Sequence, residues 1–294
     1  MTRRFALESE PVDTRFTHLV GCRLPFQLAV LGGVGTTELA AAVSSEGGLG
    51  MVPYGVEPPP TELGPSGTGF LIPYLPPVEV IAESAGRVRV VEFFEGDIDE
   101  RLVTAGHRGG ALVSWQVGSV DEGRAAEAAG CDLVVAQGAE AGGHVRGKVF
   151  LEKLLPAMLA AVGVPVVAAG GIGTANRVDA LIAAGADAVR VGTRFLACPE
   201  CNTHPAYVDA LLSAGPTDTV LTGEFDDNGY WPSTVRVLSD SLTQARRAGN
   251  RSTMPPTREA SDPLSMACYA GTSVADLTRI EAAAEVIRDL AAPL

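Results

Sequence analysis

The chain has little charge, few aromatic residues and no long apolar run. Of 294 positions, 19% are charged and 5% aromatic, whereas 46% are hydrophobic. This excludes long disordered stretches, because disorder needs low hydrophobicity and high net charge. No run of about 18 uncharged apolar residues occurs, so we expect no transmembrane helix. The start, residues 1–16, has two adjacent arginines, Arg3 and Arg4, without an apolar segment behind them and does not resemble a signal peptide.

Basic residues are also scarce, with 22 Lys and Arg against 35 Asp and Glu and a net charge of −13. An acidic protein repels nucleic acid and anionic membrane surfaces, so neither is an expected partner. Without an export signal, the composition predicts a cytoplasmic protein.

The five cysteines are an odd number, which argues against a disulfide framework in a chain of this kind. Cys198 and Cys201 form a CxxC, and His204 stands close by. No fourth ligand follows at a spacing that suits zinc. We therefore expect two reduced thiols in a loop and no bound metal.

Short apolar runs alternate with helix-forming segments along the chain. Such alternation predicts βα units and a parallel sheet, and near-continuous apolar strands suit a sheet covered on both faces. The predicted strands are 25–31, 49–54, 69–75, 87–94, 110–117, 132–137, 164–169 and 187–192. An α/β barrel needs roughly 250 residues. We predict the α/β class and a single (β/α)8 TIM barrel domain over residues 1–294.

Capping residues mark the starts of several predicted helices, since Ser, Thr and Asp accept hydrogen bonds from free N–H groups. The predicted N-caps are Thr36 or Thr37, Asp97, Ser119 and Thr174. Residues 55–68 contain too much proline and glycine for a helix and are predicted to be a loop.

An inserted segment of about 198–262 follows the eighth strand, and a C-terminal helix of about 272–291 follows it. The insertion has a predicted helix near 205–214, and 246–263 is expected to be an exposed loop or a mobile lid. An open, doubly wound sheet is the alternative to a barrel. Its GxGxxG motif is missing after the first strand, where Glu38 replaces the third glycine, so the barrel is favoured.

Two glycine motifs follow the seventh and eighth strands, where barrels commonly bind phosphate. Glycine lets backbone N–H groups approach phosphate oxygens, and a helix N-terminus adds favourable partial charge. The candidate phosphate cradle is Gly170, Gly171, Gly192 and Thr193. Arg194 either adds positive charge to this cradle or points outward into an ion pair.

The loop after the sixth strand, AQGAEAGGH at 136–144, carries candidate chemistry. Gln137 can hydrogen-bond the polar edge of a ring, and Gly142 and Gly143 allow a flat ligand to approach closely. His144 titrates near neutral pH and can act as an acid or a base.

Other polar residues have plainer interpretations. His18, His107 and His204 are expected to be structural, because a lone histidine more often is. Glu140 is expected either to cap a turn or to pair with Arg146.

Three segments together resemble the nitronate monooxygenase (2-nitropropane dioxygenase) family. They are AQGAEAGGH (136–144), PVVAAGGIG (165–173) and VGTRFLA (191–197). GGVGTTELAAAVSSEGGLGMV (32–52) is similar to the first βα unit of that family, and the final AGTSVADLTRIEAAAEVIRDL to its last helix. The resemblance covers most of the chain, in order.

The resemblance implies a barrel flavoprotein that binds FMN without a covalent link. His144 matches the family's active-site histidine, the proposed base that takes the α-proton of a nitroalkane. Family members oxidise alkyl nitronates with O2 to a carbonyl compound and nitrite, so the implied partners are a small molecule and O2; a homodimer is left open. The candidate cofactor-binding residues are Leu31, Gln137, Gly142, Gly143, Gly170, Gly171, Arg190, Val191, Gly192 and Thr193.

The chain departs from the family pattern around the flavin ring. Val30-Leu31 replaces a common Pro-Met, and Ile72-Pro73-Tyr74 replaces a stretch that often carries a flavin-contacting Asn. A Gln common before the Gly-Thr is also replaced. The phosphate motifs are intact, so FMN binding is a firmer expectation than nitronate as the substrate.

Two other functions remain open. An FMN-dependent NAD(P)H reductase of a quinone or an enoyl thioester would share the phosphate motifs. The Gln137-Gly138 pair favours the monooxygenase over an enoyl reductase but not over a quinone reductase. A catalytically decayed flavin-binding protein is the third hypothesis, against which the presence of His144 argues.

Overall fold

The computed structural model describes residues 11–231 and 233–294. Residues 1–10, most of the start that was assessed as a targeting segment, lie outside the described residues, as does Pro232. Within the described chain, no helix combines the length and apolar character needed to cross a membrane.

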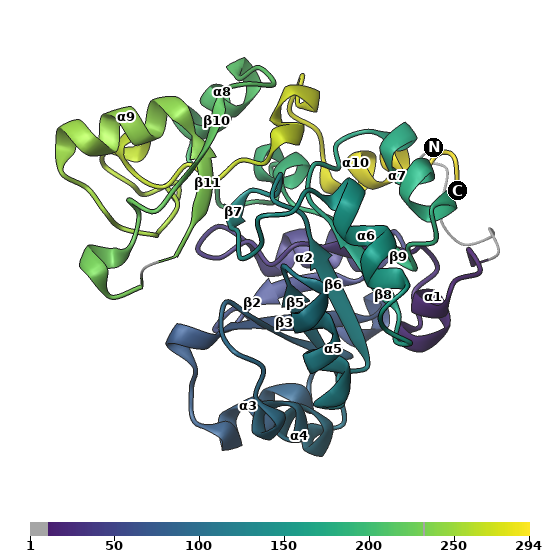
Figure 1. Cartoon of the computed structure of the whole chain (residues 1–294). Helices are drawn as coiled ribbons and strands as arrows, with labels where there is room; N and C mark the ends of the chain where they lie inside the picture. The colour runs from purple at the N-terminus through teal and green to yellow at the C-terminus, as the bar shows by residue number, and fades with distance from the viewer. Residues whose placement is uncertain (1–10, 232) are drawn as a thin grey trace.

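Eight parallel strands form the centre of the molecule, with helices around them (Figure 1). Their order in the sheet is β1-β9-β8-β6-β5-β4-β3-β2, and a bridge between Gln27 and Leu49 joins β1 to β2. The sheet therefore closes on itself, and the predicted barrel is confirmed. The strands are β1 (Phe26–Leu28), β2 (Gly50–Pro53), β3 (Ser66–Leu71), β4 (Val90–Phe94), β5 (Leu112–Val117), β6 (Leu133–Gln137), β8 (Val166–Ala169) and β9 (Ala188–Val191).

The helices around the barrel begin where side chains satisfy free N–H groups. Thr36, Ser119 and Thr174 accept hydrogen bonds at the starts of α2, α5 and α7, as predicted. The predicted Asp97 cap is wrong. Asp99 caps α4 instead, while the exposed carboxylate of Asp97 pairs with an arginine on a neighbouring loop. The helices are α1 (Arg15–Val20), α2 (Thr37–Ser45), α3 (Val78–Ala85), α4 (Glu100–Gly109), α5 (Val120–Ala128), α6 (Leu151–Leu159) and α7 (Ala175–Ala183).

The crossover before β3 differs from the prediction. Residues 55–68 are not all loop, because a 3-10 turn occupies Thr61–Leu63 and β3 already begins at Ser66; the strand ends at Leu71. A Cβ at Gly67 would lie 2.4 Å from the sulfur of Met51. Close packing between strands demands the small residues that gave this stretch its loop-like composition.

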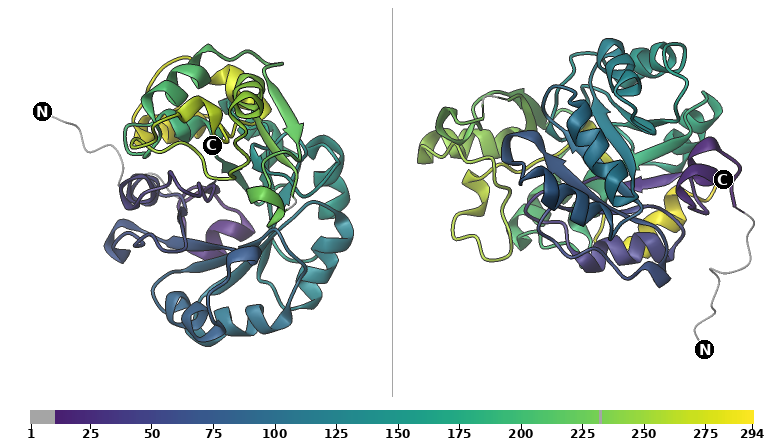
Figure 2. Two further views of the ribbon diagram at one scale, coloured as in Figure 1. Left: turned by 90° about the vertical axis from the view of Figure 1, so that its left-hand side faces the viewer. Right: turned by 90° about the horizontal axis from the view of Figure 1, so that it is seen from below.

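The insertion builds a small antiparallel sheet at one end of the barrel (Figures 1 and 2). Strand β11 lies between β10 and β7, and β7 is the loop segment that carries His144. A second apolar cluster, including Phe225 and Val237, packs this sheet against α9. The predicted helix near 205–214 is confirmed as α8. The elements are β7 (Gly143–His144), α8 (Pro205–Ser213), β10 (Thr219–Thr222), β11 (Val235–Leu238) and α9 (Ser239–Ala248).

The C-terminal helix is shorter than predicted. Residues 272–291 divide into a 3-10 turn, η6 (Thr272–Asp276), an irregular stretch and α10 (Ala283–Leu290). The break lets this segment place an acceptor from each of its three parts around Arg194. A continuous helix could not surround one guanidinium in this way.

Candidate active site

A cavity of about 570 Å³ lies at the carboxyl ends of the barrel strands, the end at which barrel enzymes carry their sites. Loops after β1, β6, β8 and β9 form its walls, together with residues of the insertion. Val191 points into the hydrophobic core, and its carbonyl accepts the N–H of Ala29. The predicted residues on the walls are Leu31, Gln137, Gly142, Gly143, His144, Gly170, Gly171, Arg190, Gly192 and Thr193.

One end of the cavity is formed by the two glycine loops. Gly170 and Gly171 have φ angles of 110° and 65°, in the left-handed region that favours glycine. A Cβ at Gly171 would lie 2.9 Å from the side chain of Glu140, so the loop has no room for a larger residue. The hydroxyl of Thr193 accepts the N–H of Gly271, at 3.0 Å. This end is a backbone-lined cradle of the kind that holds a phosphate.

The C-terminal segment completes this end, which the sequence analysis did not anticipate. Ser273 lies on the cavity wall beside the glycine loops. A Cβ at Gly142 would come within 2.5 Å of the backbone nitrogen of Gly271, so the segment touches the loop after β6. The sequence AGTS at 270–273 was the available signal for this part of the site. No spacing rule links these residues to the glycine loop after β8, some 100 residues earlier.

A buried ion pair lies beneath the cavity. Arg190 on β9 donates to Glu92 on β4 at 2.6 Å, and Gln27 on β1 donates to the other carboxylate oxygen at 3.0 Å. Both Arg190 and Glu92 also line the cavity. The three side chains join strands across the barrel and fix the floor of the site. Glu92 was missed because it interrupts an otherwise apolar strand.

The loop after β6 is held by its own side chains. The amide of Gln137 donates to the carbonyl of His144 at 2.8 Å and accepts the N–H of Arg146 at 3.3 Å. Glu140 accepts the N–H of the first residue of α6, so the capping alternative is correct. Pairing of Glu140 with Arg146 is wrong, because Arg146 binds Glu122 at 2.6 Å. These bonds set the position of His144.

The His144 ring lies in an aromatic enclosure. It stacks on Trp231 with ring centroids 3.8 Å apart and planes 9° from parallel, and Phe94 and Tyr269 lie close by. Its Nε2 atom is buried with no hydrogen-bond partner among the described residues. Burial lowers the pKa of His144 to about 3, although the carboxylate of Asp227 acts in the opposite direction. The ring is therefore neutral at physiological pH.

Asp227 is the other polar group at this end, and it was also missed from the sequence. Its carboxylate accepts the N–H and the hydroxyl of Thr253, at 2.7 and 2.6 Å, and the hydroxyl of Tyr74 at 2.6 Å. Burial opposes ionisation, but these hydrogen bonds outweigh it and lower the pKa of Asp227. Its φ of 49° is unusual outside glycine. The bonds join the insertion to the barrel rim.

The stretch 246–263 is partly helical, since α9 continues to Ala248, and its middle lines the cavity. Thr253, Met254 and Pro255 lie on the wall rather than forming only an exposed loop. The insertion therefore forms part of the candidate site.

A nitrogen of a second cavity-lining residue also lacks a partner. The Nε2 of Gln116, at the end of β5, is buried and makes no hydrogen bond to the described residues. A buried amide without a partner is costly, and ligands often satisfy such groups. With the glycine cradle at one end, the cavity fits a flat ligand that carries a phosphate.

The remaining candidates make structural contacts. His18 and His107 pair with aspartates, and His204 caps α8. Cys198 and Cys201 are buried free thiols, and burial raises the pKa of both. Within residues 11–231 and 233–294, no group of three or more His, Cys, Asp or Glu side chains is arranged so that it could hold a metal ion.

The fold and the site define the class of this protein as an α/β barrel with a glycine-lined cavity and a histidine at the carboxyl ends of its strands. The family model described as nitronate monooxygenase matches residues 68–292. The chain belongs to the nitronate monooxygenase family.

Relatives in sequence and in structure agree with this assignment. A nitronate monooxygenase of Pseudomonas aeruginosa is 34% identical over 266 residues, covering 71% of this chain and 76% of the relative. A probable nitronate monooxygenase of Staphylococcus aureus is 43% identical over 117 residues, which cover 36% of this chain and 33% of the relative.

Two solved structures share the whole fold. FabK from Thermotoga maritima has a TM-score of 0.79 at 29% identity and covers 95% of each chain. A nitroalkane oxidase from Streptomyces ansochromogenes has a TM-score of 0.74 at 29% identity and covers 94% of this chain and 96% of its own. The chain is thus an oxidoreductase on a barrel shared by both.

Proposed function

We propose that this protein binds FMN in the cavity and oxidises alkyl nitronates with O2 to carbonyl compounds and nitrite. The observation that carries the proposal is a single cavity with a glycine cradle at one end and His144 at the other. Family membership and the likeness to a nitroalkane oxidase support the same reaction. One O2 balances two nitronates, giving two carbonyl compounds and two nitrite ions.

The residues present fit FMN. The glycine loops would hold its phosphate through backbone N–H groups, and the unpaired amide of Gln116 would satisfy an acceptor on the ring edge. The hydroxyl of Tyr74 donates to Asp227. It therefore does not replace the flavin contact that an Asn makes in other family members. The bound flavin supplies the electron-transfer chemistry of the reaction.

The state of His144 favours a nitronate over a neutral nitroalkane. A base whose conjugate acid has a pKa of about 3 is poorly matched to removal of a proton at neutral pH. A nitronate has already lost that proton. The neutral ring can instead donate a hydrogen bond from its buried, unpaired Nε2 to a nitronate oxygen. We therefore assign His144 the role of binding and orienting the nitronate.

The proposal is tested by the visible spectrum of the purified protein and by turnover. We expect a yellow protein that releases one FMN per chain, consumes O2 with butyl-1-nitronate and forms nitrite. A colourless protein that gains no absorbance with added FMN contradicts the cofactor. A yellow protein that forms no nitrite with any alkyl nitronate contradicts the reaction.

The NAD(P)H-dependent reductase remains the competing function. The likeness to FabK concerns the barrel fold, which a monooxygenase and a reductase would share. Anaerobic mixing with NADH or NADPH separates the two, because only a reductase would lose its flavin colour rapidly.

A further inference from the structure

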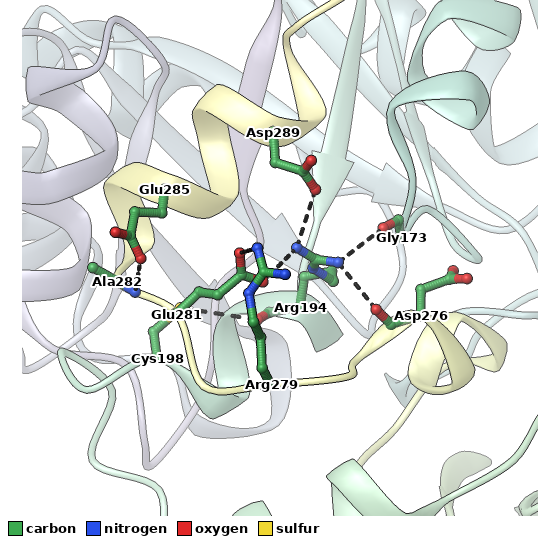
Figure 3. Close-up of polar contacts among 9 residues, drawn as sticks. All are labelled: Gly173, Arg194, Cys198, Asp276, Arg279, Glu281, Ala282, Glu285 and Asp289. Carbon is green, nitrogen blue, oxygen red and sulfur yellow. Dashed lines mark hydrogen bonds and ion pairs between the residues drawn. The ribbon is translucent and has the colours of Figure 1, made fainter.

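Arg194 directly follows Thr193 of the glycine cradle, and its two terminal guanidinium nitrogens contact four residues (Figure 3). Its side chain is 8% exposed. One guanidinium nitrogen donates to the carbonyls of Asp276 and Gly173, at 3.0 and 3.4 Å. The other contacts the carboxylates of Glu281 and Asp289, at 3.0 and 3.3 Å. Arg194 does not line the cavity and points into an ion pair, so the ion-pair alternative is confirmed, and the pair with Glu281 is buried.

These partners come from the segments that build the cradle. Gly173 ends the glycine loop after β8 and directly precedes Thr174, the N-cap of α7. A Cβ at Gly173 would lie 2.2 Å from a carboxylate oxygen of Asp276, so this loop and the C-terminal segment are in contact. Arg194 itself follows Thr193, which binds the same segment through Gly271. One guanidinium thus joins the loop after β8, the loop after β9 and the C-terminal segment.

The charges in this cluster matter for an anionic ligand. Glu281 and Asp289 pair with Arg194, and the carboxylate of Asp276 lies on the same segment (Figure 3). Among the described residues, the largely exposed Arg279 also pairs with Glu281. Burial raises the pKa of Asp276, and Arg194 opposes that shift. Without Arg194, uncompensated carboxylates would lie behind a group that carries nearly two negative charges.

We propose that Arg194 is a positioning residue for the cofactor phosphate, which it serves by fixing both cradle loops and by neutralising the carboxylates behind them. The inference rests on the proposed binding of FMN. Changes of Arg194 should therefore lower the affinity for the phosphate group and not for the flavin ring, because Arg194 does not line the cavity in which the ring would lie.

The comparison of FMN with riboflavin isolates that effect, since riboflavin is the same molecule without the phosphate. We would measure the Kd of each for the flavin-free protein by quenching of flavin fluorescence. Arg194→Gln removes charged hydrogen bonds and should weaken FMN about 10- to 100-fold, with riboflavin changed less than about twofold. Arg194→Lys keeps the charge but not the planar fork, and should weaken FMN about five- to tenfold.

Arg288→Gln is the matched control. Arg288 lies on the same helix, α10, and pairs with Glu46 at the surface, with 60% of its side chain exposed. Both Kd values should stay within about twofold of wild type. If the Arg194 variants fail to fold, Glu281→Gln retains an acceptor for the guanidinium but removes its buried charge partner. Arg194 then keeps its other contacts and has one negative charge fewer to neutralise, so FMN should bind as tightly as to wild type or up to about threefold more tightly, with riboflavin unchanged.

The outcomes separate the two proposals. If wild-type protein binds FMN and the Arg194 variants lose FMN and riboflavin equally, or lose neither, the positioning role is wrong and FMN binding stands. If Glu281→Gln weakens FMN and riboflavin binding equally, the positioning role is also wrong. If wild-type protein binds neither flavin, the proposed function fails and this inference fails with it.

Discussion

The two ends of the cavity are built in different ways. The glycine end, where we propose that the phosphate binds, consists of backbone from two adjacent βα loops, and Arg194 donates to the carbonyl of Gly173 in one of them. The histidine end consists of side chains from distant segments: His144 from the loop after β6, Trp231 and Asp227 from the insertion, and Tyr74 from the barrel rim. A cradle made of backbone tolerates almost no change of residue, whereas an enclosure made of side chains can be altered one contact at a time.

This difference matters for function. On the proposed function, the glycine end would hold the cofactor phosphate, and its geometry depends on glycine conformations and close contacts. The histidine end would bind the substrate, through one neutral ring and the aromatic groups around it. Variants at the two ends should therefore fail differently: one set in cofactor binding, the other in turnover with the cofactor still bound.

The largest effect is expected from Gly171→Val. Valine would need a positive φ and would place its Cβ 2.9 Å from Glu140, so the loop must move and the phosphate site closes. We expect a protein purified without flavin and an FMN affinity reduced at least about 100-fold.

Gly223→Val is the control for this change. Nothing lies closer than 3.9 Å to a Cβ at Gly223, and its φ is not in the left-handed region. Its FMN content should equal that of wild type. Full flavin content in Gly171→Val would show that the phosphate does not lie against this loop.

His144→Ala should retain FMN and lose turnover. Removing a hydrogen-bond donor to an anionic substrate costs about 1.5–3 kcal/mol, which corresponds to a roughly 10- to 100-fold lower kcat/KM for a nitronate. Neutral nitroalkanes should be poor substrates for both wild type and variant. If His144→Ala slows nitroalkanes far more than nitronates, His144 acts as the base, and the binding role assigned here is wrong.

Trp231→Ala should change the pH dependence as well as the rate. Loss of the stacked ring admits water to His144, so its pKa should rise from about 3 towards the ordinary value of about 6.5. Wild type should show no break from His144 above about pH 5, whereas the variant should gain one between about pH 5 and 7. The measurement is kcat/KM for a nitronate against pH, with a rate loss of about tenfold at pH 8.

Tyr230→Ala is the matched control, because Tyr230 is the neighbouring aromatic residue but is 67% exposed and does not stack on His144. Its pH profile should match that of wild type. The same break in both variants would trace the change to the segment as a whole rather than to Trp231.

The smallest effect is expected from Gln137→Leu. Gln137 holds the backbone of the His144 loop, so the variant should keep FMN and lose a few-fold in kcat. Contact with the flavin ring is a separate prediction, checked by the reduction potential of the bound flavin. A lower kcat with an unchanged potential would mean that Gln137 only positions the loop.

The same contrast explains what the sequence could predict. The eight strands and the cradle glycines follow from apolar runs and short local motifs, which need no knowledge of distant residues. Trp231, Asp227 and Ser273 reach the cavity only through the path of the insertion and the C-terminal segment, which no periodicity encodes. Likewise, Ser66-Gly67 looked like loop because the strand packing that requires small residues is a tertiary effect.

Arg194 shows, at a single residue, what the sequence could not predict. Its place directly after the cradle suggested either a phosphate contact or an outward ion pair. The structure shows the ion pair, but buries the arginine against carboxylates that lie some 90 residues away in the sequence. An arginine at this position indicated an acidic partner, but only the fold shows that the partners are Glu281 and Asp289.

Anaerobic mixing of the FMN-loaded protein with butyl-1-nitronate, and separately with NADPH, tests the central claim most directly. The account predicts that the nitronate changes the flavin absorbance rapidly and that NADPH leaves it unchanged over the same time. Rapid bleaching by NADPH, with no response to the nitronate, would contradict the account and identify the protein as a reductase.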